Sequence, residues 1–180
     1  CELFPVNIGA LTDGRHPRIQ NRVVRHGTGN IARGPAMSRE ECMQAVLTGA
    51  DIVCGLKKEG YNLIVTGEMG IGNTTTSSAC ASVLFGQDAE TVTGRGAGLS
   101  TEGLERKVQT IKKAIEVNRP DPEDALDVIS KIGGLDIAGM VGCYLGAAYC
   151  RMPILIDGFI SAISAYLAAM LCGTAKEYMI

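Results

Sequence analysis

Residues 67–79 read GEMGIGNTTTSSA, and this glycine-rich stretch lies between two segments of different character. The five residues before it, NLIVT at 62–66, form a short apolar run that favours a strand buried on both faces. The segment TTTSSACASVL, which begins at residue 74, consists mostly of small residues, and the Asn or Thr at its start can cap a helix. This segment therefore predicts a helix. A strand, a glycine loop and a helix in this order form the repeating unit of parallel α/β folds.

A second unit of this kind follows nearer the end of the sequence. PILI at 153–156 is another short apolar run, Asp157-Gly158 comes directly after it, and 159–171 has the character of a buried helix. Ligands of open parallel sheets bind outside the carboxyl ends of the strands, so both loops face one crevice if the two strands are neighbours. We predict a doubly wound, Rossmann-like α/β fold with a parallel sheet, helices on both faces and one domain over 1–180.

Two further helices are indicated before and after the first unit. Ser38, with Glu41 three residues later, forms a capping-box pattern that begins a helix ending at Gly60. A second glycine loop, TGRGAGLS at 93–100, precedes a helical stretch over 104–117.

The segment between that stretch and PILI predicts two more helices. Asp121 before Pro122 indicates a helix start, and Gly133-Gly134 indicates its end. The next helix covers 135–149. Its small residues recur four apart, a pattern typical of close packing within a chain or at a subunit contact: Ala138, Gly142 and Gly146.

Composition argues against several classes of partner. The formal net charge is -2, which gives no electrostatic footprint for nucleic acid or for an anionic membrane. The apolar tracts 135–150 and 159–172 are both shorter than the about 20 residues that a membrane-spanning helix needs. We therefore expect no nucleic-acid partner and no membrane partner.

The seven cysteines lie in apolar stretches, without a C-x-x-C pair or a histidine at ligand spacing. We predict that they are small core residues, that the protein has no metal site and no cofactor, and that it is cytoplasmic. The two histidines, His16 and His26, lie in a polar segment that predicts a solvated loop.

The first glycine loop matches the phosphate-binding pattern G-x-x-x-x-G-K-[ST] at Gly67, Gly72 and Thr74, but Asn73 stands in place of the lysine. The missing ammonium argues against a nucleoside triphosphate with Mg²⁺ and favours one monophosphate held by backbone amides and hydroxyls. The alternative is a tight turn and a helix cap without a ligand.

Three charged residues are candidates to act beside that phosphate. Glu68 would repel a phosphate if it pointed into the loop, so we expect it to point elsewhere, toward ribose hydroxyls or toward positive charge that develops on the sugar. Lys107 either supplies a cation for the phosphate or is an ordinary solvated lysine. Asp157 directly follows a buried strand, and core packing gives no reason for a charged side chain at that position.

Four segments together resemble the nicotinate-nucleotide:dimethylbenzimidazole phosphoribosyltransferase family. They are GEMGIGNTTTSSA, VTGRGAGL with Lys107 after it, SKIGGLDIAGMVGCYLGAA and RMPILIDGFISA, and the upstream RHGTGNIARGPAMSREE is similar too. The resemblance implies transfer of the 5-phosphoribosyl group from nicotinate mononucleotide to 5,6-dimethylbenzimidazole, giving α-ribazole 5′-phosphate and nicotinate in cobalamin assembly. It also implies a homodimer and chemistry without a metal.

By the same resemblance, the residues at matching positions would line the ribotide pocket. They are Gly67, Glu68, Gly70, Gly72, Asn73, Thr74, Gly94, Gly96, Lys107, Asp157 and Gly158. The family's general base, a glutamate in an L-G-E-G-[ST]-G segment, has no counterpart in these 180 residues. We therefore expect a fragment that holds nicotinate ribotide weakly and turns over poorly or not at all, with Glu68 in a supporting role.

Two rival functions stay open at the level of sequence. A degenerate P-loop nucleotide-binding protein requires Mg²⁺ and an aspartate after a neighbouring strand, and PILID at 153–157 fits that pattern. A non-catalytic ribotide-binding module accounts equally well for the absent base.

Overall fold

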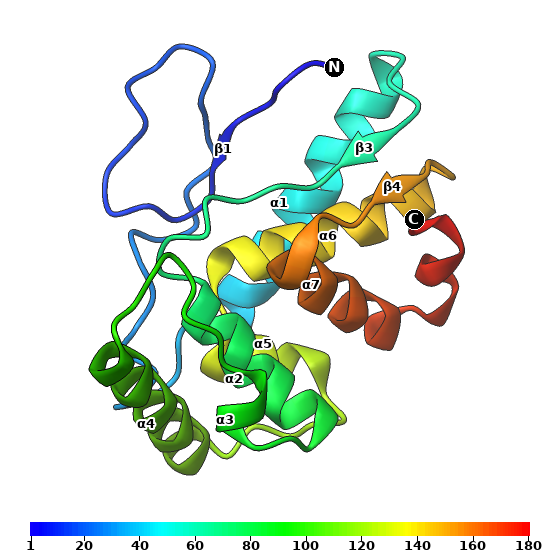
Figure 1. Cartoon of the computed structure of the whole chain (residues 1–180). Coiled ribbons are helices and arrows are strands. Elements are labelled where there is room, and N and C mark those ends of the chain that lie inside the picture. The colour runs from blue at the N-terminus through cyan, green and yellow to red at the C-terminus, as the bar shows by residue number, and fades with distance from the viewer.

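The computed structural model describes all 180 residues, and helices make up most of it (Figure 1). The elements are β1 (Val6–Asn7), β2 (Gln20–Asn21), α1 (Arg39–Lys58), β3 (Ile64–Val65), α2 (Thr74–Phe85), α3 (Ala89–Val92), α4 (Thr101–Asn118), α5 (Ala125–Ile132), α6 (Leu135–Tyr149), β4 (Ile154–Leu155), α7 (Gly158–Leu171) and the 3-10 helix η1 (Gly173–Tyr178).

The two predicted strands are neighbours and run parallel. In β3 and β4, Ile64 pairs with Ile154 and Val65 with Leu155. Met179 adds a parallel bridge to Ile154. The prediction of an α/β fold with a parallel sheet is confirmed, and the carboxyl ends of β3 and β4 meet at one edge.

The burial expected for 62–66 is wrong. Leu63 and Val65 are 49% and 52% exposed. These two residues lie on the same face of β3, so that face is open to solvent. β3 pairs with β4 alone, so the sheet is small, and a second parallel pair, β1 with β2, was not expected from the sequence.

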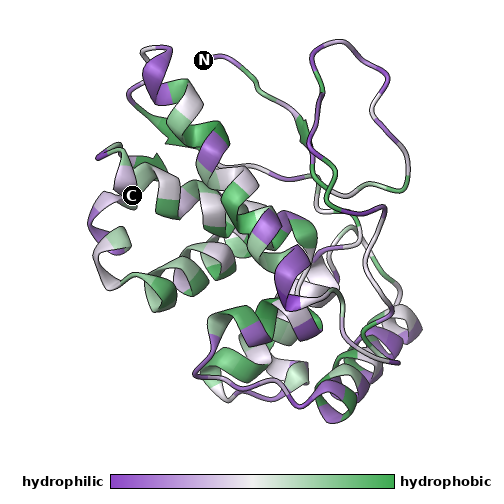
Figure 2. Ribbon diagram, turned by 180° about the vertical axis from the view of Figure 1, so that it is seen from behind, coloured by the Kyte–Doolittle hydropathy of each residue, from purple (hydrophilic) through white to green (hydrophobic).

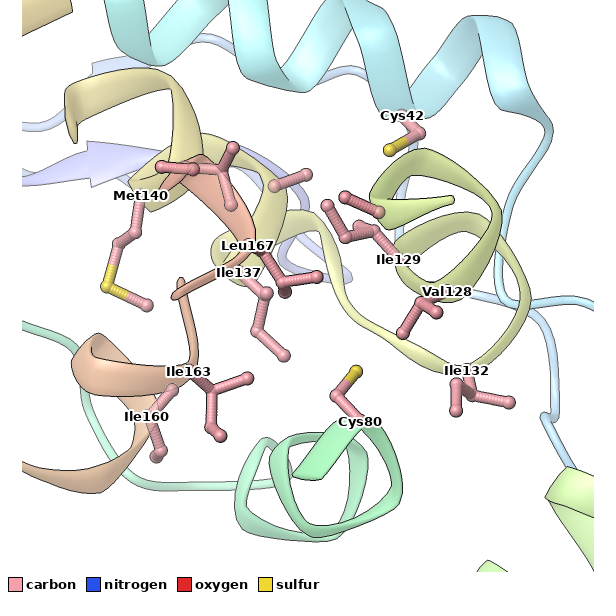
Figure 3. Close-up of a cluster of buried hydrophobic side chains, with 14 of the residues drawn as sticks. Cys42, Cys80, Val128, Ile129, Ile132, Ile137, Met140, Ile160, Ile163 and Leu167 are labelled. Atoms are coloured by element: carbon pink, nitrogen blue, oxygen red, sulfur yellow. The ribbon is translucent and has the colours of Figure 1, made fainter. Parts of the chain in front are cut away.

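A cluster of 32 buried residues forms the core, and α6 runs through its centre with side chains buried around most of its circumference. α1 and α7 pack against α6, α5 packs against α1 and α7, and α2 packs against α5 and α7. Figure 3 shows side chains from these helices meeting in one cluster. Figure 2 shows α7 in mostly pale to hydrophobic colours, as expected for a helix inside the protein. The tracts 135–150 and 159–172 are thus core helices, and none of the helices combines the length and apolar character needed to cross a membrane.

The small-residue stripe of α6 packs against α1 of the same chain. A Cβ added at Gly142 would lie 1.9 Å from Val46 O, and one added at Gly146 would lie 2.8 Å from Ala50 Cα. The backbones therefore touch, which only glycine permits at these positions. Because α1 fills the stripe, this surface provides no argument for a subunit contact.

The first predicted helix start is correct and a later one is wrong. Ser38 and Glu41 form a complete capping box at the start of α1. Asp121, however, does not begin α5. Its Oδ1 accepts a hydrogen bond from the backbone amide of Glu123 at 3.0 Å, which forms a local turn before the helix. Asp124 is the N-cap instead, and it accepts the amides of Leu126 and Asp127.

The cysteine and histidine predictions are only partly confirmed. Cys42 and Cys80 are buried, whereas Cys1 and Cys172 are exposed and therefore are not core residues. All seven are free thiols. His16 and His26 lie in exposed loop segments before α1, as expected.

Candidate functional site

The first glycine loop leaves the carboxyl end of β3 and enters α2. Gly70 and Gly72 have φ angles of +70° and +82°, which other residues rarely adopt, so these glycines define the path of the loop. Gly67 and Gly72 are exposed. Asn73 takes the N-cap position of α2, and Thr74 is its first residue.

Glu68 turns back onto its own loop. Its Oε2 accepts a hydrogen bond from the Gly70 amide and another from Asn73 Nδ2 at 2.7 Å. The expectation that Glu68 points away from the loop is therefore wrong. The carboxylate of Glu68 accepts the hydrogen bond of the Gly70 amide, so that amide is not free to bind a phosphate in this conformation.

Asn73 joins two carboxylates rather than capping its helix. Its Nδ2 donates to Glu68 Oε2 and to Asp136 Oδ2, both at 2.7 Å, and its side chain makes no cap hydrogen bond. Both amide protons are used, whereas Oδ1 is buried without a partner. Where a triphosphate loop has an ammonium, this loop has a neutral bridge between Glu68 and Asp136.

Asp136 was missed by the sequence reasoning. It lies in the first turn of α6, 63 residues from Asn73. An acidic residue is ordinary in a first turn, where it interacts favourably with the helix dipole. Its one distinguishing feature was its place at the start of an otherwise apolar helix, directly after Gly133-Gly134 and Leu135.

Lys107 of α4 connects the two glycine loops. Its side chain is buried, with a relative exposure of 7%, and Nζ donates to Thr74 Oγ1 and to Gly94 O, both at 3.0 Å. A Cβ added at Gly96 would lie 3.1 Å from Thr74 Oγ1, so the second loop lies against the start of α2. The alternative of a solvated lysine is therefore wrong.

The electrostatics of Lys107 are unusual for a buried lysine. Burial lowers the pKa of Lys107 below its ordinary value. Its hydrogen-bond partners are a hydroxyl and a carbonyl, and none of the ion pairs in the protein includes it. A buried ammonium without a carboxylate is costly, and an anionic ligand would remove that cost.

A cavity of about 380 Å³ opens beside this lysine. It is lined by Thr74, Ser78, Val92, Gly94, Gly96, Lys107 and Phe159. The start of α2, the second loop, α4 and the first turn of α7 thus meet at one cavity. A larger hollow of about 620 Å³ lies along α4 between charged side chains and contains none of the predicted residues.

Asp157-Gly158 lies next to Phe159 of this cavity, at the carboxyl end of β4. Asp157 is the N-cap residue of α7 without a side-chain cap, and Gly158 has a φ of +77°. Both are exposed. The Asp157 amide donates to Ser161 Oγ at 3.2 Å, which fixes the turn between β4 and α7.

Three buried side-chain oxygens lack a hydrogen-bond partner, and they cluster along the two loops and α2. They are Asn73 Oδ1, Ser77 Oγ and Thr93 Oγ1. Buried polar atoms are nearly always paired, so these three oxygens are free to accept hydrogen bonds from water or from a ligand.

Parallel strands, glycine turns at their carboxyl ends and a buried lysine define an α/β protein whose candidate ligand site lies at the edge of the sheet. A family described as phosphoribosyltransferase matches residues 1–180. The chain belongs to this phosphoribosyltransferase family.

Named relatives agree with that assignment. The nicotinate-nucleotide–dimethylbenzimidazole phosphoribosyltransferase of Acetivibrio thermocellus is 53% identical over 178 residues, 99% of this chain and 51% of the relative. The enzyme of the same name from Ruminiclostridium cellulolyticum is 49% identical over 180 residues, 100% of this chain and 51% of the relative. The crystal structure of CobT from Thermus thermophilus superposes with a TM-score of 0.90 at 35% identity, covering 97% of this chain and 53% of that one. The chain spans about half the length of the curated relatives it matches.

Proposed function

We propose that this chain forms the ribotide-binding part of an enzyme that moves the 5-phosphoribosyl group from nicotinate mononucleotide to 5,6-dimethylbenzimidazole. The products are α-ribazole 5′-phosphate and nicotinate, as in cobalamin assembly. The observation that carries the proposal is the buried ammonium of Lys107, which has no carboxylate partner and borders a cavity between the second glycine loop and the start of α2. The names of the relatives supply the substrates.

The 5′-phosphate is assigned to the cavity beside Lys107. The ammonium, the Thr74 hydroxyl and the amides of Gly94 and Gly96 are the donors near it, and the amino end of α2 adds the positive end of its dipole. One phosphate is thus held by one ammonium and these hydrogen-bond donors. No second cation for outer phosphates is required.

The ribose is assigned to the side of α2 where Glu68, Asn73 and Asp136 meet. Two carboxylates and the unpartnered Asn73 Oδ1 are acceptors for sugar hydroxyls. The negative charge of Glu68 and Asp136 also favours the positive charge that develops on C1′ as the bond to nicotinate breaks. Gly67, Gly70 and Gly72 shape the loop that brings these groups together, and Asp157-Gly158 follows the neighbouring strand β4 at the same edge of the sheet.

In the proposed reaction, a benzimidazole nitrogen attacks C1′ from the face opposite nicotinate and inverts the anomer. The C1′–N bond to nicotinate breaks, and its electron pair returns to the ring nitrogen, which neutralises the positive charge there. A general base takes the proton from the other benzimidazole nitrogen. Glu68 is not assigned this role, because its Oε2 already accepts two hydrogen bonds within the loop. It acts as an electrostatic support.

Calorimetric titration with nicotinate mononucleotide tests the proposal. We expect binding without Mg²⁺, competition by ribose 5-phosphate, and indifference to ATP. Tight, Mg²⁺-dependent ATP binding with no response to nicotinate mononucleotide would instead establish the degenerate P-loop function. Ribotide binding with no α-ribazole phosphate formed, even by a polypeptide of the relatives' full length carrying this sequence, would establish a non-catalytic module.

Three further properties belong to the proposal. One domain spans 1–180, the protein is cytoplasmic, and the enzyme is a homodimer. The cytoplasmic assignment rests on the sequence pattern, in which seven cysteines are scattered through apolar stretches without a C-x-x-C pair. The dimer rests on the family resemblance alone, since α1 covers the small-residue stripe of α6. Sedimentation equilibrium tests it.

A further inference from the structure

Two cysteines that are far apart in the sequence meet where α1 and α6 end. Cys150 Sγ donates to Cys54 Sγ at a distance of 3.1 Å, across a separation of 96 residues. Cys54 lies in the last turns of α1, and Cys150 is the C-cap of α6. Neither belongs to the candidate ligand site.

The packing of the two helices enforces this contact. Val46 touches Gly142, and four residues further on in both helices Ala50 touches Gly146. Another four residues on in both helices are Cys54 and Cys150. Because residues four apart lie on one face of a helix, the thiol pair is the next contact of the same seam, and both helices run in the same direction along it.

We propose that Cys54 and Cys150 form a dithiol site that closes to an intramolecular disulfide by exchange with a low-molecular-weight disulfide. A disulfide bond is about 2.05 Å long, so the two sulfurs have to approach by about 1 Å, which small rotations of both side chains provide. The backbone seam brings the two helices into direct contact at Gly142 and Gly146, about two turns and one turn before the thiol pair.

The reaction balances with a reagent such as glutathione disulfide. One protein thiolate attacks the reagent, forms a mixed disulfide and releases one small thiol. The second protein thiol then displaces the other small thiol, so two protein thiols are oxidised and one reagent disulfide is reduced to two thiols.

The surroundings leave the pair reachable but slow to react at neutral pH. Burial, followed by the neighbouring Cys150 and Asp51, raises the pKa of Cys54 to about 11, so little of this thiol is ionised at neutral pH and its exchange is faster at alkaline pH. Both cysteines are only half-buried, whereas Cys42 and Cys80 are fully buried. Closure would fasten the end of α1 to the turn at Arg151, which leads into β4.

Peptide mapping tests the proposal directly. Reduced protein is incubated with glutathione disulfide at mildly alkaline pH, unfolded, alkylated and digested without reductant. We expect a cross-linked pair of peptides that contain Cys54 and Cys150, lighter by two hydrogens than their sum. The melting temperature should rise by about 10 °C relative to the reduced protein, because the bond closes a long loop.

Matched variants complete the test. Cys54→Ser and Cys150→Ser should each abolish the cross-link and the rise in melting temperature, while Cys172→Ser, which removes an exposed thiol, should retain both. If Cys54→Ser does not fold, Cys54→Ala takes its place and should likewise abolish the cross-link. Recovery of Cys54 and Cys150 as separately alkylated peptides, or equal cross-linking of other cysteines, would overturn the proposal.

Discussion

Thr66 Oγ1 and Ser161 Oγ lie 2.5 Å apart, although 95 residues separate them. Tyr144 Oη completes a buried triangle, at 2.9 Å from Thr66 Oγ1 and 2.5 Å from Ser161 Oγ. The hydroxyl of Thr66 also donates to Leu155 O at 3.3 Å, so the triangle is connected to the backbone of β4 as well. This triangle ties the carboxyl end of β3 to the start of α7, so it holds the two edges of the candidate site together.

Replacing Tyr144 with Phe should destabilise the protein by about 1 kcal/mol, since Thr66 and Ser161 lose one partner but keep each other. Urea denaturation measures the change. Tyr166→Phe is the control, because Tyr166 is 43% exposed and its hydroxyl has no hydrogen bond in the protein. Equal losses in the two variants would mean that the buried triangle contributes nothing specific.

Lys107→Met should weaken binding of nicotinate mononucleotide at least tenfold. A hydrogen bond to a charged group contributes about 1.5–3 kcal/mol, and Lys107 is the cation at the cavity. Lys112→Met is the matched control, because Lys112 lies on the same helix but is half exposed and pairs with Glu90. Calorimetry distinguishes the two. A similar loss in both variants would indicate a general effect of net charge.

Ligand affinity should fall at alkaline pH. Burial lowers the pKa of Lys107, and a bound phosphate stabilises the ammonium and raises that pKa. Affinity is therefore complete while Lys107 is protonated in the free protein, and it declines as pH rises through the lowered pKa. Titrations from pH 7 upward, where the phosphate is already a dianion, check this, and Lys107→Met should give a flat profile.

Protein stability without ligand should show the opposite trend. An unfolded lysine holds its proton up to about pH 10.4, whereas folded Lys107 releases it earlier. Between those values the unfolded state binds more protons, so Lys107 makes the free energy of unfolding increase with pH. Urea denaturation of wild type and Lys107→Met over this range isolates the contribution.

The sequence predicted those parts of the fold that depend on local patterns. The strands near Ile64 and Ile154 and the cap at Ser38 follow from apolar runs and capping groups that lie within a few residues of each other. β1 and β2 were missed because VN and QN carry no strand pattern. The burial of β3 was mispredicted because an apolar run predicts a strand but does not show whether both faces of that strand are covered.

The candidate site was predictable only in part, for the same reason. The glycine loops and Lys107 were identified from motifs, but the contact between Asn73 and Asp136 joins two elements that only the fold brings together. The direction of Glu68 was mispredicted because only repulsion by a ligand was considered. In the protein, the nearest donor is the Gly70 amide of the same loop.

Asn73→Lys restores the lysine of the triphosphate-binding pattern, and we expect that it does not produce ATP binding. The new ammonium would lie between Glu68 and Asp136, whose carboxylates are both 2.7 Å from Asn73 Nδ2, and two ion pairs would hold it away from a phosphate. Titration with ATP and Mg²⁺ measures the outcome. Micromolar binding would mean that these carboxylates do not control position 73.

Gly142→Ala should destabilise the protein by at least about 2 kcal/mol, because the added Cβ would lie 1.9 Å from the carbonyl oxygen of Val46 and neither helix backbone can move without disturbing the whole seam. Gly55→Ala provides the control within α1, since an added Cβ meets nothing within 4 Å there. That variant should gain about 0.5–1 kcal/mol, because alanine has a higher helix propensity than glycine. Urea denaturation with comparable slopes for all three proteins gives the comparison. If Gly142→Ala is as stable as wild type, α1 and α6 do not approach each other as closely as described, and the contact between Cys54 and Cys150 loses its structural basis.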